Sequence, residues 1–301
     1  MAKHDVTDVE SAVKACYSTW ADSYFRDYYT GGAYPPVHLD VVRDLLRKAR
    51  TKTLLDAGCG PASMLRGLAD MGLEIYGFDL TPEMVEAARN AVREFGVAPE
   101  RIWQGSVTDR QAFRQPGTAG PFDATICIGV FPHIPESVED EVIANLRDSV
   151  RKGGLVAVEA RNQLFGLFTL NRHSYDLFAS ELIRAEQLRG AAASTVVDAM
   201  LDELRKQFRM DLPSVRSGKS GEPGYDQVLA RLHNPLTLQK RFSQAGFAEV
   251  QVHFYHYHCL PPMLEPMAPE LFRSASLAME NPSDWRGYFM ASAFIVTGLR
   301  A

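Results

Sequence analysis

Between Thr51 and Ala160, short β-branched runs alternate with stretches whose apolar residues recur at helical spacing. This alternation is typical of a parallel sheet whose strands are joined by crossover helices. The predicted strands are residues 53–57, 74–79, 101–106, 123–128 and 155–160. We therefore expect an α/β core over residues 51–160, with its ligand outside the carboxyl ends of the strands.

The segments on either side of this core extend the predicted architecture. Residues 1–50 are typical of an N-terminal helical cap, and residues 161–232 of a mostly helical insertion after strand five. The α/β pattern resumes over residues 233–301, with strands predicted at 249–258 and 289–299. We expect a seven-stranded, mostly parallel sheet with an antiparallel last strand, and a helical lid inserted after strand five.

Composition and charge exclude several classes of protein. The chain of 301 residues has 32 basic and 37 acidic side chains and a formal net charge of -5, without the basic excess that a phosphate-binding surface needs. No apolar stretch approaches the roughly 18 residues of a membrane span, and the N-terminus lacks a signal-peptide core. The four cysteines are widely separated, which disfavours a disulfide scaffold or a zinc finger. We expect a cytoplasmic protein without nucleic-acid or membrane partners.

The strongest chemical signal is the run D-A-G-C-G at residues 56–60, directly after the first predicted strand. Its glycines permit a tight turn and close approach of a ligand, and the following helix offers unpaired N–H groups. Asp56 would repel a pyrophosphate, and Ser63 stands where a dinucleotide-binding fingerprint has glycine, so both argue against NAD. An acid there suits a ligand with positive charge, such as S-adenosylmethionine with its amino group and sulfonium.

A second acid, Asp79, follows 23 residues after Asp56 at the end of the next predicted strand, where a carboxylate can accept both ribose hydroxyls. The further motifs, in order, are WQGSVTD at 103–109, FDATICIGVFPHIP at 122–135 and VRKGGLVAVE at 150–159. With this series, residues 53–160 resemble the class I S-adenosylmethionine-dependent methyltransferases. The resemblance implies a Rossmann-like sheet, S-adenosylmethionine as the cofactor and S-adenosylhomocysteine as its product.

Carried over residue by residue, the resemblance also implies how the cofactor binds. The implied contacts are Asp56, Gly58, Cys59 and Gly60 for the methionyl part, Asp79 for the ribose, Leu80, Ser106 and Val107 for the adenine, Ile128 or Gly129 for the sulfonium, and Tyr24 from an N-terminal helix that often closes over the cofactor. The sequence departs from the family at Ala62, in place of a third glycine. It also departs at Ser106, where many relatives have an aspartate that accepts from the adenine amino group. A hydroxyl can accept that hydrogen bond as well.

Candidate residues for catalysis and acceptor binding cluster after strands four and five. His133 and His173 are candidate general bases, because the ordinary pKa of histidine lies near neutrality, although a histidine at either position can also be structural. The candidate acceptor-binding residues are Tyr28, Arg161, Asn162, Arg172, Tyr175 and His256. Arginines suit a carboxylate or phosphate on the acceptor, and an asparagine can orient it.

The strand predicted at 249–258 contains three histidines. Alternation would point His256 and His258 to one face and Tyr255 and Tyr257 to the other. Two histidines fall short of the three protein ligands that a catalytic zinc normally needs, so packing is favoured over a metal site and no metal is expected.

These observations predict an S-adenosylmethionine-dependent methyltransferase that acts on a small polar molecule by in-line transfer, with the lid selecting the acceptor. Oxygen is the first expectation for the methylated atom, because two candidate bases lie near the expected site. Nitrogen is the alternative, since a neutral amine needs little help from a base. A non-catalytic S-adenosylmethionine-binding accessory protein and a homodimer, formed through a sheet edge or the lid, both remain open.

Overall fold

The structure is a computed structural model of the chain, and it describes residues 5–21, 24–25, 35–114, 120–183, 185–191, 194–212, 224 and 227–301. The chain divides into two compact units. One, the core unit, comprises Met1–Arg161, Val215–His253 and Phe294–Ala301. The other, the helical unit, comprises Asn162–Ser214 and Phe254–Ala293.

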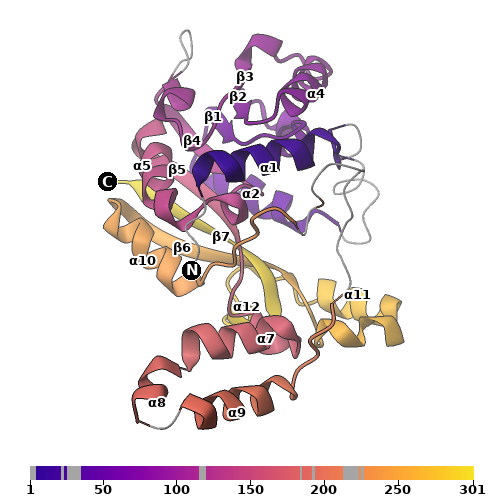
Figure 1. Cartoon of the computed structure of the whole chain (residues 1–301). Helices are drawn as coiled ribbons and strands as arrows, with labels where there is room; N and C mark the ends of the chain where they lie inside the picture. The colour runs from indigo at the N-terminus through magenta and orange to yellow at the C-terminus, as the bar shows by residue number, and fades with distance from the viewer. Residues whose placement is uncertain are drawn as a thin grey trace. The chain divides into compact units, whose positions relative to one another are not determined.

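Seven strands of the described chain form one sheet in the order β3-β2-β1-β4-β5-β7-β6 (Figure 1). They are β1 (Thr53–Ala57), β2 (Glu74–Asp79), β3 (Ile102–Gln104), β4 (Phe122–Cys127), β5 (Val150–Arg161), β6 (Phe247–Tyr257) and β7 (Ala291–Arg300). Strands β1 to β5 are parallel, whereas β7 runs antiparallel to both of its neighbours. The predicted seven-stranded, mostly parallel sheet with an antiparallel last strand is therefore confirmed.

The centre of the sheet explains where a ligand can bind. In β1, Leu54 and Leu55 are fully buried, as expected for a parallel strand covered on both faces. Asp56 pairs in register with Gly77 of β2 on one side and Ile126 of β4 on the other, so the three strands end close together. The chain order reverses at β1, and loops that leave such a switch point in opposite directions open a crevice between them.

Helices and short 3-10 turns connect the strands of the core unit. The helices are α1 (Val6–Ser18), α2 (Val37–Lys48), α3 (Ser63–Leu68), α4 (Pro82–Arg93), α5 (Glu139–Ser149) and α10 (Pro235–Gln244), and the 3-10 turns include η2 (Ala69–Met71), η3 (Pro99–Arg101), η4 (Arg110–Arg114), η5 (Phe131–His133) and η6 (Glu136–Val138). Their starts follow from local sequence. The side chain of Asp5 caps α1 by accepting a hydrogen bond from the N–H of Thr7 at 2.8 Å. Helix α4 begins with a proline, which is tolerated there because the first N–H groups of a helix have no partner within the helix.

The helical unit is built from two separate segments of the chain. It contains α6 (Gly166–Thr169), α7 (Arg172–Leu177), the π-helix η7 (Phe178–Leu182), α8 (Ala185–Ala191), α9 (Ser194–Arg205), η9 (Pro262–Met267), α11 (Pro269–Leu277) and α12 (Gly287–Met290). Asn162 joins the two segments, because its Nδ2 donates to the carbonyl oxygens of Gly287, Tyr288 and Ala291 at 2.8–3.1 Å. The helices predicted after strand five are present. No helix within the described ranges is long and apolar enough to cross a membrane.

The end of β6 is buried on neighbouring residues and has one irregular backbone position. The neighbouring residues Phe254 and Tyr255 are both buried, as is Tyr257. The backbone at His256 is left-handed, with φ of 60°, which interrupts the pleat. The rings of His256 and His258 nevertheless pack together, with centroids 5.1 Å apart, as expected for two residues on one face.

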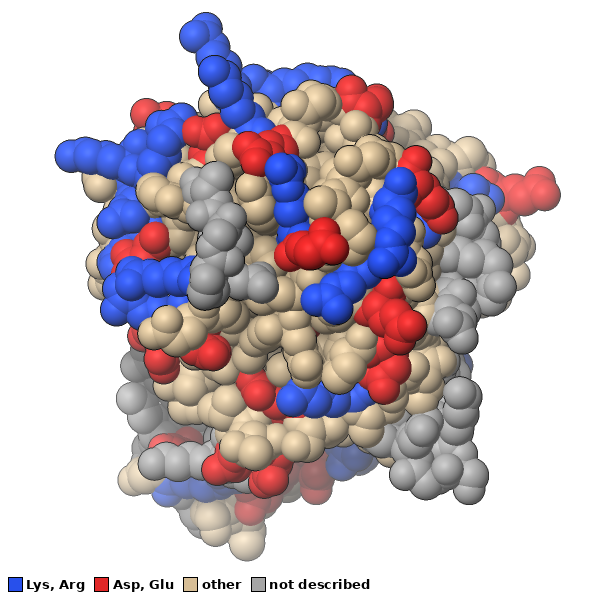
Figure 2. Space-filling view, turned by 90° about the horizontal axis from the view of Figure 1, so that it is seen from above, with Lys and Arg blue, Asp and Glu red and all other residues tan. Residues whose placement is uncertain are grey.

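Charged side chains of both signs are interspersed on the face of the molecule that Figure 2 presents. In the core unit, Arg66 pairs with Glu94 at 2.7 Å and Arg151 with Asp123 at 2.6 Å, and all four side chains are partly exposed. Exposed pairs of this kind contribute about 0–1 kcal/mol each, so the stability of the core unit rests mainly on its buried interior.

Candidate cofactor site

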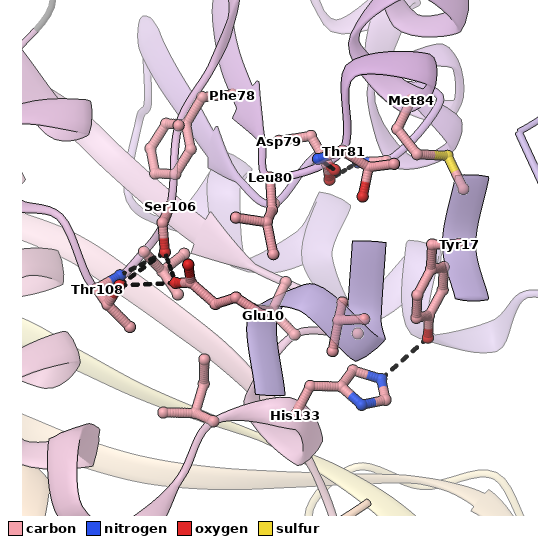
Figure 3. A pocket seen from close by; sticks show the side chains of 18 of the residues that line it. Glu10, Tyr17, Phe78, Asp79, Leu80, Thr81, Met84, Ser106, Thr108 and His133 are labelled. Carbon is pink, nitrogen blue, oxygen red and sulfur yellow. Dashed lines mark hydrogen bonds between the residues drawn. The ribbon is translucent and has the colours of Figure 1, made fainter. Parts of the chain in front are cut away.

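A cavity lies at the carboxyl ends of the strands of the core unit and contains about 790 Å³ of empty space, its open mouth included (Figure 3). The loops after β1, β2, β3 and β4 contribute to its lining, and so does one face of α1. The predicted cofactor residues that line it are Tyr24, Gly58, Gly60, Asp79, Leu80, Ser106, Val107, Ile128 and Gly129, and His133 lines it as well. The cavity thus unites most of the residues that the sequence motifs single out.

The turn after β1 is fixed by backbone bonds and depends on glycine. The N–H groups of Gly58 and Cys59 donate to the carbonyl oxygen of Phe78 at 2.8 and 2.9 Å, which ties the turn to the end of β2. Gly58 has φ of +85°, and a Cβ built on it would lie 2.3 Å from Cγ2 of Val130. A Cβ on Gly60 would meet open space. The turn therefore needs glycine at position 58 and exposes the backbone of Gly60 to the cavity, which leaves room for a ligand to approach.

Asp79 connects the turn after β1 to the start of α4. Its Oδ2 accepts from the N–H of Gly60 at 2.8 Å, and its Oδ1 accepts from the N–H of Thr81 at 2.9 Å. Burial raises the pKa of Asp79, and the hydrogen bonds from Thr81 and Gly60 oppose that shift. Each carboxylate oxygen keeps a lone pair beyond these bonds, which suits the two neighbouring hydroxyls of a ribose.

Asp56 lies near the end of β1 and Cys59 in the turn that follows, but neither is among the residues that line the cavity. Burial, together with the charge of Asp79, raises the pKa of Asp56 to about 8. Cys59 packs against β2, since a Cβ on Gly77 would lie 3.2 Å from its Sγ. Two buried acids beside a ligand cavity suit a cation, because positive charge nearby would stabilise their ionised forms.

One end of the cavity is closed by the loop after β3 and by α1. The hydroxyls of Ser106 and Thr108 lie 2.5 and 2.9 Å from the same Oε1 of Glu10, a residue of α1 (Figure 3). Apolar side chains surround this group, among them Val9 and Leu80. This end therefore offers a flat ligand an apolar surface and one carboxylate.

His133, a predicted base, is held by hydrogen bonds at both ring nitrogens. Its Nδ1 lies 2.6 Å from the carbonyl oxygen of Leu229, which can only accept, so Nδ1 carries the proton. Nε2 then accepts from the phenol of Tyr17 at 2.9 Å (Figure 3). Burial lowers the pKa of His133 to about 4. The hydrogen bond with Leu229 raises this pKa, and the charge of Arg161 lowers it further, but both effects are smaller than that of burial. The imidazole is therefore neutral at physiological pH.

A buried ion cluster supports the loop that carries His133. Glu139, 1% exposed, accepts from Arg231 at 2.5 Å, from Arg241 at 2.6 Å and from the ring of His233 at 3.2 Å. Burial alone would raise the pKa of Glu139, but the hydrogen bonds and charges of His233 and Arg231 lower it to about 2. Arg231 also donates to the carbonyl oxygens of Pro132 and Ile134, on either side of His133. The cluster thereby fixes the backbone around this histidine.

The space above Gly129 is bordered by a phenol and an acid. A Cβ built on Gly129 would have Oη of Tyr24 at 3.8 Å and Oε2 of Glu159 at 3.9 Å as its nearest atoms. Tyr24 packs beside Trp20 and Tyr17, with ring centroids 6.0 and 6.2 Å apart. Gly129 therefore leaves room for a ligand group next to two polar side chains.

The remaining predicted residues lie elsewhere, and their functional roles remain predictions. Arg161 ends β5, where its carbonyl oxygen accepts from the N–H of His233 at 2.8 Å. The helical unit contains Asn162, Arg172, His173, Tyr175 and His256, whereas Tyr28 is outside the described residues. The Asn162 amide bonds three carbonyl oxygens and the N–H of Leu164, so we assign it a structural role.

Sequence reasoning singled out Tyr24 and Tyr28 from the N-terminal segment but missed the contribution of α1. Val6, Glu10, Val13 and Tyr17 all line the cavity. They recur at intervals of three or four residues and so share one face of a helix, which is a signal present in the sequence. That signal identifies a face but not the surface it covers. Nowhere in the described ranges do three or more His, Cys, Asp or Glu side chains gather so that they could hold a metal ion.

Comparisons with known proteins agree with this geometry. Residues 54–154 match the family described as "Methyltransferase domain". A ubiquinone biosynthesis O-methyltransferase of Xanthomonas axonopodis pv. citri is 31% identical over 138 residues, which are 46% of this chain and 54% of the relative. The homologue from Xanthomonas campestris pv. campestris is 33% identical over 140 residues, with the same coverage. The chain thus matches about half the length of these curated relatives.

Solved structures share the fold at low sequence identity. An O-methyltransferase family protein from Burkholderia thailandensis superimposes with a TM-score of 0.51 at 15% identity, over 95% of this chain and 59% of that one. Magnesium protoporphyrin IX methyltransferase from Synechocystis PCC 6803, solved with bound S-adenosylhomocysteine, gives 0.50 at 15% identity over 98% of this chain and 100% of that one. The core of the chain is a class I S-adenosylmethionine-dependent methyltransferase domain.

Proposed function

We propose that the protein transfers the methyl group of S-adenosylmethionine to a hydroxyl oxygen of a small polar molecule. The observation that carries the proposal is the composition of the cavity. It combines a glycine turn beside Asp56, the diol-binding geometry of Asp79, and the neutral Tyr17–His133 pair. These elements supply, in turn, a place for a cation, for a ribose and for the proton of an acceptor.

S-adenosylmethionine supplies an electrophilic methyl group and a good leaving group, so the protein has to align the acceptor and receive its proton. In the proposed step the acceptor hydroxyl donates to Oη of Tyr17, and the proton of Tyr17 moves to Nε2 of His133. The carbonyl oxygen of Leu229 keeps the ring in the tautomer that can accept this proton. The sulfonium loses its positive charge as the methyl group leaves, so protonated His133 replaces that charge and the net charge of the cavity is unchanged.

Oxygen is preferred for two reasons. The Tyr17–His133 pair provides a route for a hydroxyl proton, and the curated relatives are O-methyltransferases. Nitrogen is the second candidate, favoured by one observation. The carboxylate of Glu159 lies beside the space above Gly129, where it could pair with an amine. We assign the choice of acceptor to the helical unit, through Arg172, His173 and Tyr175 of α7.

The experiment that tests this proposal has two stages. Calorimetric titration with S-adenosylmethionine, S-adenosylhomocysteine and NAD in parallel should give binding of the first two only. Hydroxyl and amine acceptors of similar size are then offered with a labelled methyl donor, and mass spectrometry locates the label. Methylation of an oxygen atom supports the proposal. Methylation of a nitrogen atom would instead make the protein an N-methyltransferase, the second candidate. Binding of the cofactor without methyl transfer to either panel of acceptors favours an accessory role.

The cytoplasm is the proposed location. Cys59, Cys127 and Cys259 form no disulfide, and the first two of these thiols are buried. Cysteines that stay reduced are typical of proteins in a reducing compartment.

A further inference from the structure

Glu10 has an unusual place in the cavity. It lies on α1, nearly one hundred residues before the loop that follows β3, yet its Oε1 lies within hydrogen-bonding distance of two hydroxyls of that loop, those of Ser106 and Thr108. Figure 3 shows the side chain reaching from the helix toward these hydroxyls. The carboxylate is therefore fixed in position by two partners rather than left to rotate.

The carboxylate of Glu10 can accept further hydrogen bonds beyond those from the two hydroxyls. A carboxylate accepts through both oxygens and has about four lone-pair sites, whereas each hydroxyl brings only one proton. Both hydroxyls are directed at Oε1, and among the described residues no hydrogen bond reaches Oε2 of Glu10. The Ser106 hydroxyl has less acceptor capacity left, because it donates a hydrogen bond to Glu10 and already accepts one from the N–H of Thr108 at 3.1 Å. The free acceptor capacity at this end of the cavity is thus concentrated on Glu10.

The order of the subsites indicates which part of the cofactor meets this end. With the methionyl part at the glycine turn and the ribose at Asp79, the section that remains is lined by Leu80, Val107 and the α1 side chains. Those side chains are largely apolar, as an aromatic base requires. The exocyclic amino group of an adenine brings two N–H donors into this section, where they need an acceptor.

We propose that Glu10 accepts a hydrogen bond from the adenine amino group of S-adenosylmethionine, with Ser106 and Thr108 holding its carboxylate in place. The acid that selects adenine comes from the N-terminal helix, not from the loop after β3, where this chain has only the Ser106 hydroxyl. One consequence is that α1 belongs to the cofactor site. A cofactor bound to Glu10 holds α1 against the core strands, so binding protects this helix. The proposal rests on the cofactor of the proposed function and not on the identity of the acceptor.

The test is a thermodynamic double-mutant cycle in which the Glu10 side chain and the adenine amino group are each removed, separately and together. Calorimetry compares S-adenosylhomocysteine with its analogue in which hydrogen replaces the 6-amino group, on the full chain and on Glu10→Ala. Loss of a hydrogen bond to a charged group should weaken S-adenosylhomocysteine about 10- to 100-fold in the variant. The analogue should bind both proteins with the same affinity within about 2-fold. Equal losses for the two ligands would overturn the proposal and leave Glu10 a structural residue.

Two further variants test whether the loss of affinity in Glu10→Ala is a direct effect of the missing carboxylate. Asp8→Ala changes an exposed acid on the same helix and should leave both affinities unchanged. Ser106→Asp, introduced together with Glu10→Ala, returns an acid to the loop after β3 and should recover at least 10-fold of the lost affinity for S-adenosylhomocysteine only. Failure of this rescue, with both proteins folded, would contradict the proposal. Failure of the unaltered chain to bind S-adenosylhomocysteine would instead contradict the proposed function.

Hydrogen exchange gives a readout that does not depend on affinity. S-adenosylhomocysteine at saturation should slow exchange of the α1 amides, residues 6–18, in the unaltered chain. The analogue without the amino group should protect them less. Equal protection by the two ligands would show that α1 does not sense the amino group, which would overturn the role of Glu10.

Discussion

Tyr17 and His133 are 116 positions apart in the chain, yet the phenol of one donates to Nε2 of the other at 2.9 Å. The contact links α1 to the loop after β4, and it is edge-on as well as polar, with ring centroids 5.5 Å apart. Since Nδ1 of the same ring is held by the carbonyl oxygen of Leu229, the histidine is fixed from two directions. Its reactivity can therefore be tested through the partner at each nitrogen.

Replacement of Tyr17 by phenylalanine removes the hydroxyl and keeps the ring. We expect Tyr17→Phe to lower kcat about 100-fold, because the acceptor proton loses its route to His133, while the affinity for S-adenosylhomocysteine changes less than 3-fold. Radiolabel transfer and calorimetry measure the two quantities. Tyr76→Phe is the matched control, since that hydroxyl bonds Glu74 and does not line the cavity. A normal kcat in Tyr17→Phe would remove the phenol from the mechanism.

Substitutions of Asp79 and His133 should have different effects, the first on cofactor affinity and the second on the rate of turnover. Asp79→Ala removes both proposed ribose acceptors and the bonds from Gly60 and Thr81, and we expect at least a 100-fold loss of affinity for S-adenosylhomocysteine. His133→Ala should leave that affinity within a few-fold and slow turnover. Glu83→Ala, on the exposed first turn of α4, is the control for the helix. If the two cavity variants lost binding equally, this division of roles would be wrong.

Burial raises the pKa of Asp56 to about 8, and we therefore expect cofactor binding to depend on pH. Between its ordinary pKa of 3.8 and this value, the folded protein holds a proton that the unfolded chain has lost. Burial of this carboxyl therefore costs stability that increases as the pH rises from about 4 to 8. A bound cation lowers that pKa, so binding should release up to one proton below pH 8, and affinity should rise by up to about 10-fold per pH unit.

Calorimetry in two buffers of different ionisation enthalpy counts the protons that Asp56 releases. Because the amino group of the ligand titrates in the same range, the reference is Asp56→Asn, which keeps the shape of the side chain. The unaltered protein should release more protons at about pH 6.5 than this variant does. Equal proton counts would show that Asp56 does not change its protonation state when the ligand binds.

The cluster around Glu139 should be the most sensitive electrostatic feature of the core unit. Glu139→Gln leaves Arg231 and Arg241 without their buried counter-charge, and we expect a loss of about 3 kcal/mol in the free energy of unfolding. Asp140→Asn is the control, because this exposed partner of Arg241 should cost less than about 1 kcal/mol. Urea titration measures both. Similar small losses would mean that the buried pairs merely offset their desolvation.

The same cluster predicts how the protein responds to acid. The pKa of Glu139 falls from 4.5 to about 2 on folding, so its contribution to stability is fully present above pH 4.5 and disappears as the pH falls toward 2. The difference in stability between the unaltered protein and Glu139→Gln should therefore narrow over this range. A constant difference would assign the effect to packing rather than to charge.

The central strands and the cofactor turn could be predicted from the sequence because their signals are local. The predicted strands at 53–57 and 74–79 coincide with β1 and β2, and the glycines of the turn have positive φ as the motif requires. A short buried apolar run followed by a glycine turn is recognisable without knowledge of its neighbours. The order of the strands does not follow from this pattern, because right-handed crossovers are compatible with more than one order of parallel strands.

The contacts that define the cavity could not be predicted, because they join distant segments. Nothing in the sequence near Glu10 indicates that its carboxylate meets Ser106, and nothing near His133 indicates the carbonyl oxygen of Leu229. The amide of Asn162 illustrates the opposite problem, since a polar residue at the end of a strand suggests ligand binding but here bonds backbone. Side-chain type gives the chemistry of a residue, and only the fold gives its partner.

The bonds of Asn162 also bear on the order in which the chain can fold during synthesis. Its three carbonyl partners, at Gly287, Tyr288 and Ala291, are made at least 125 residues after it. A ribosome that adds about 5–20 residues per second therefore needs roughly 6–25 s to deliver them. Over that interval the parallel strands β1 to β5 are already available to pair, while the helical unit still lacks its second segment.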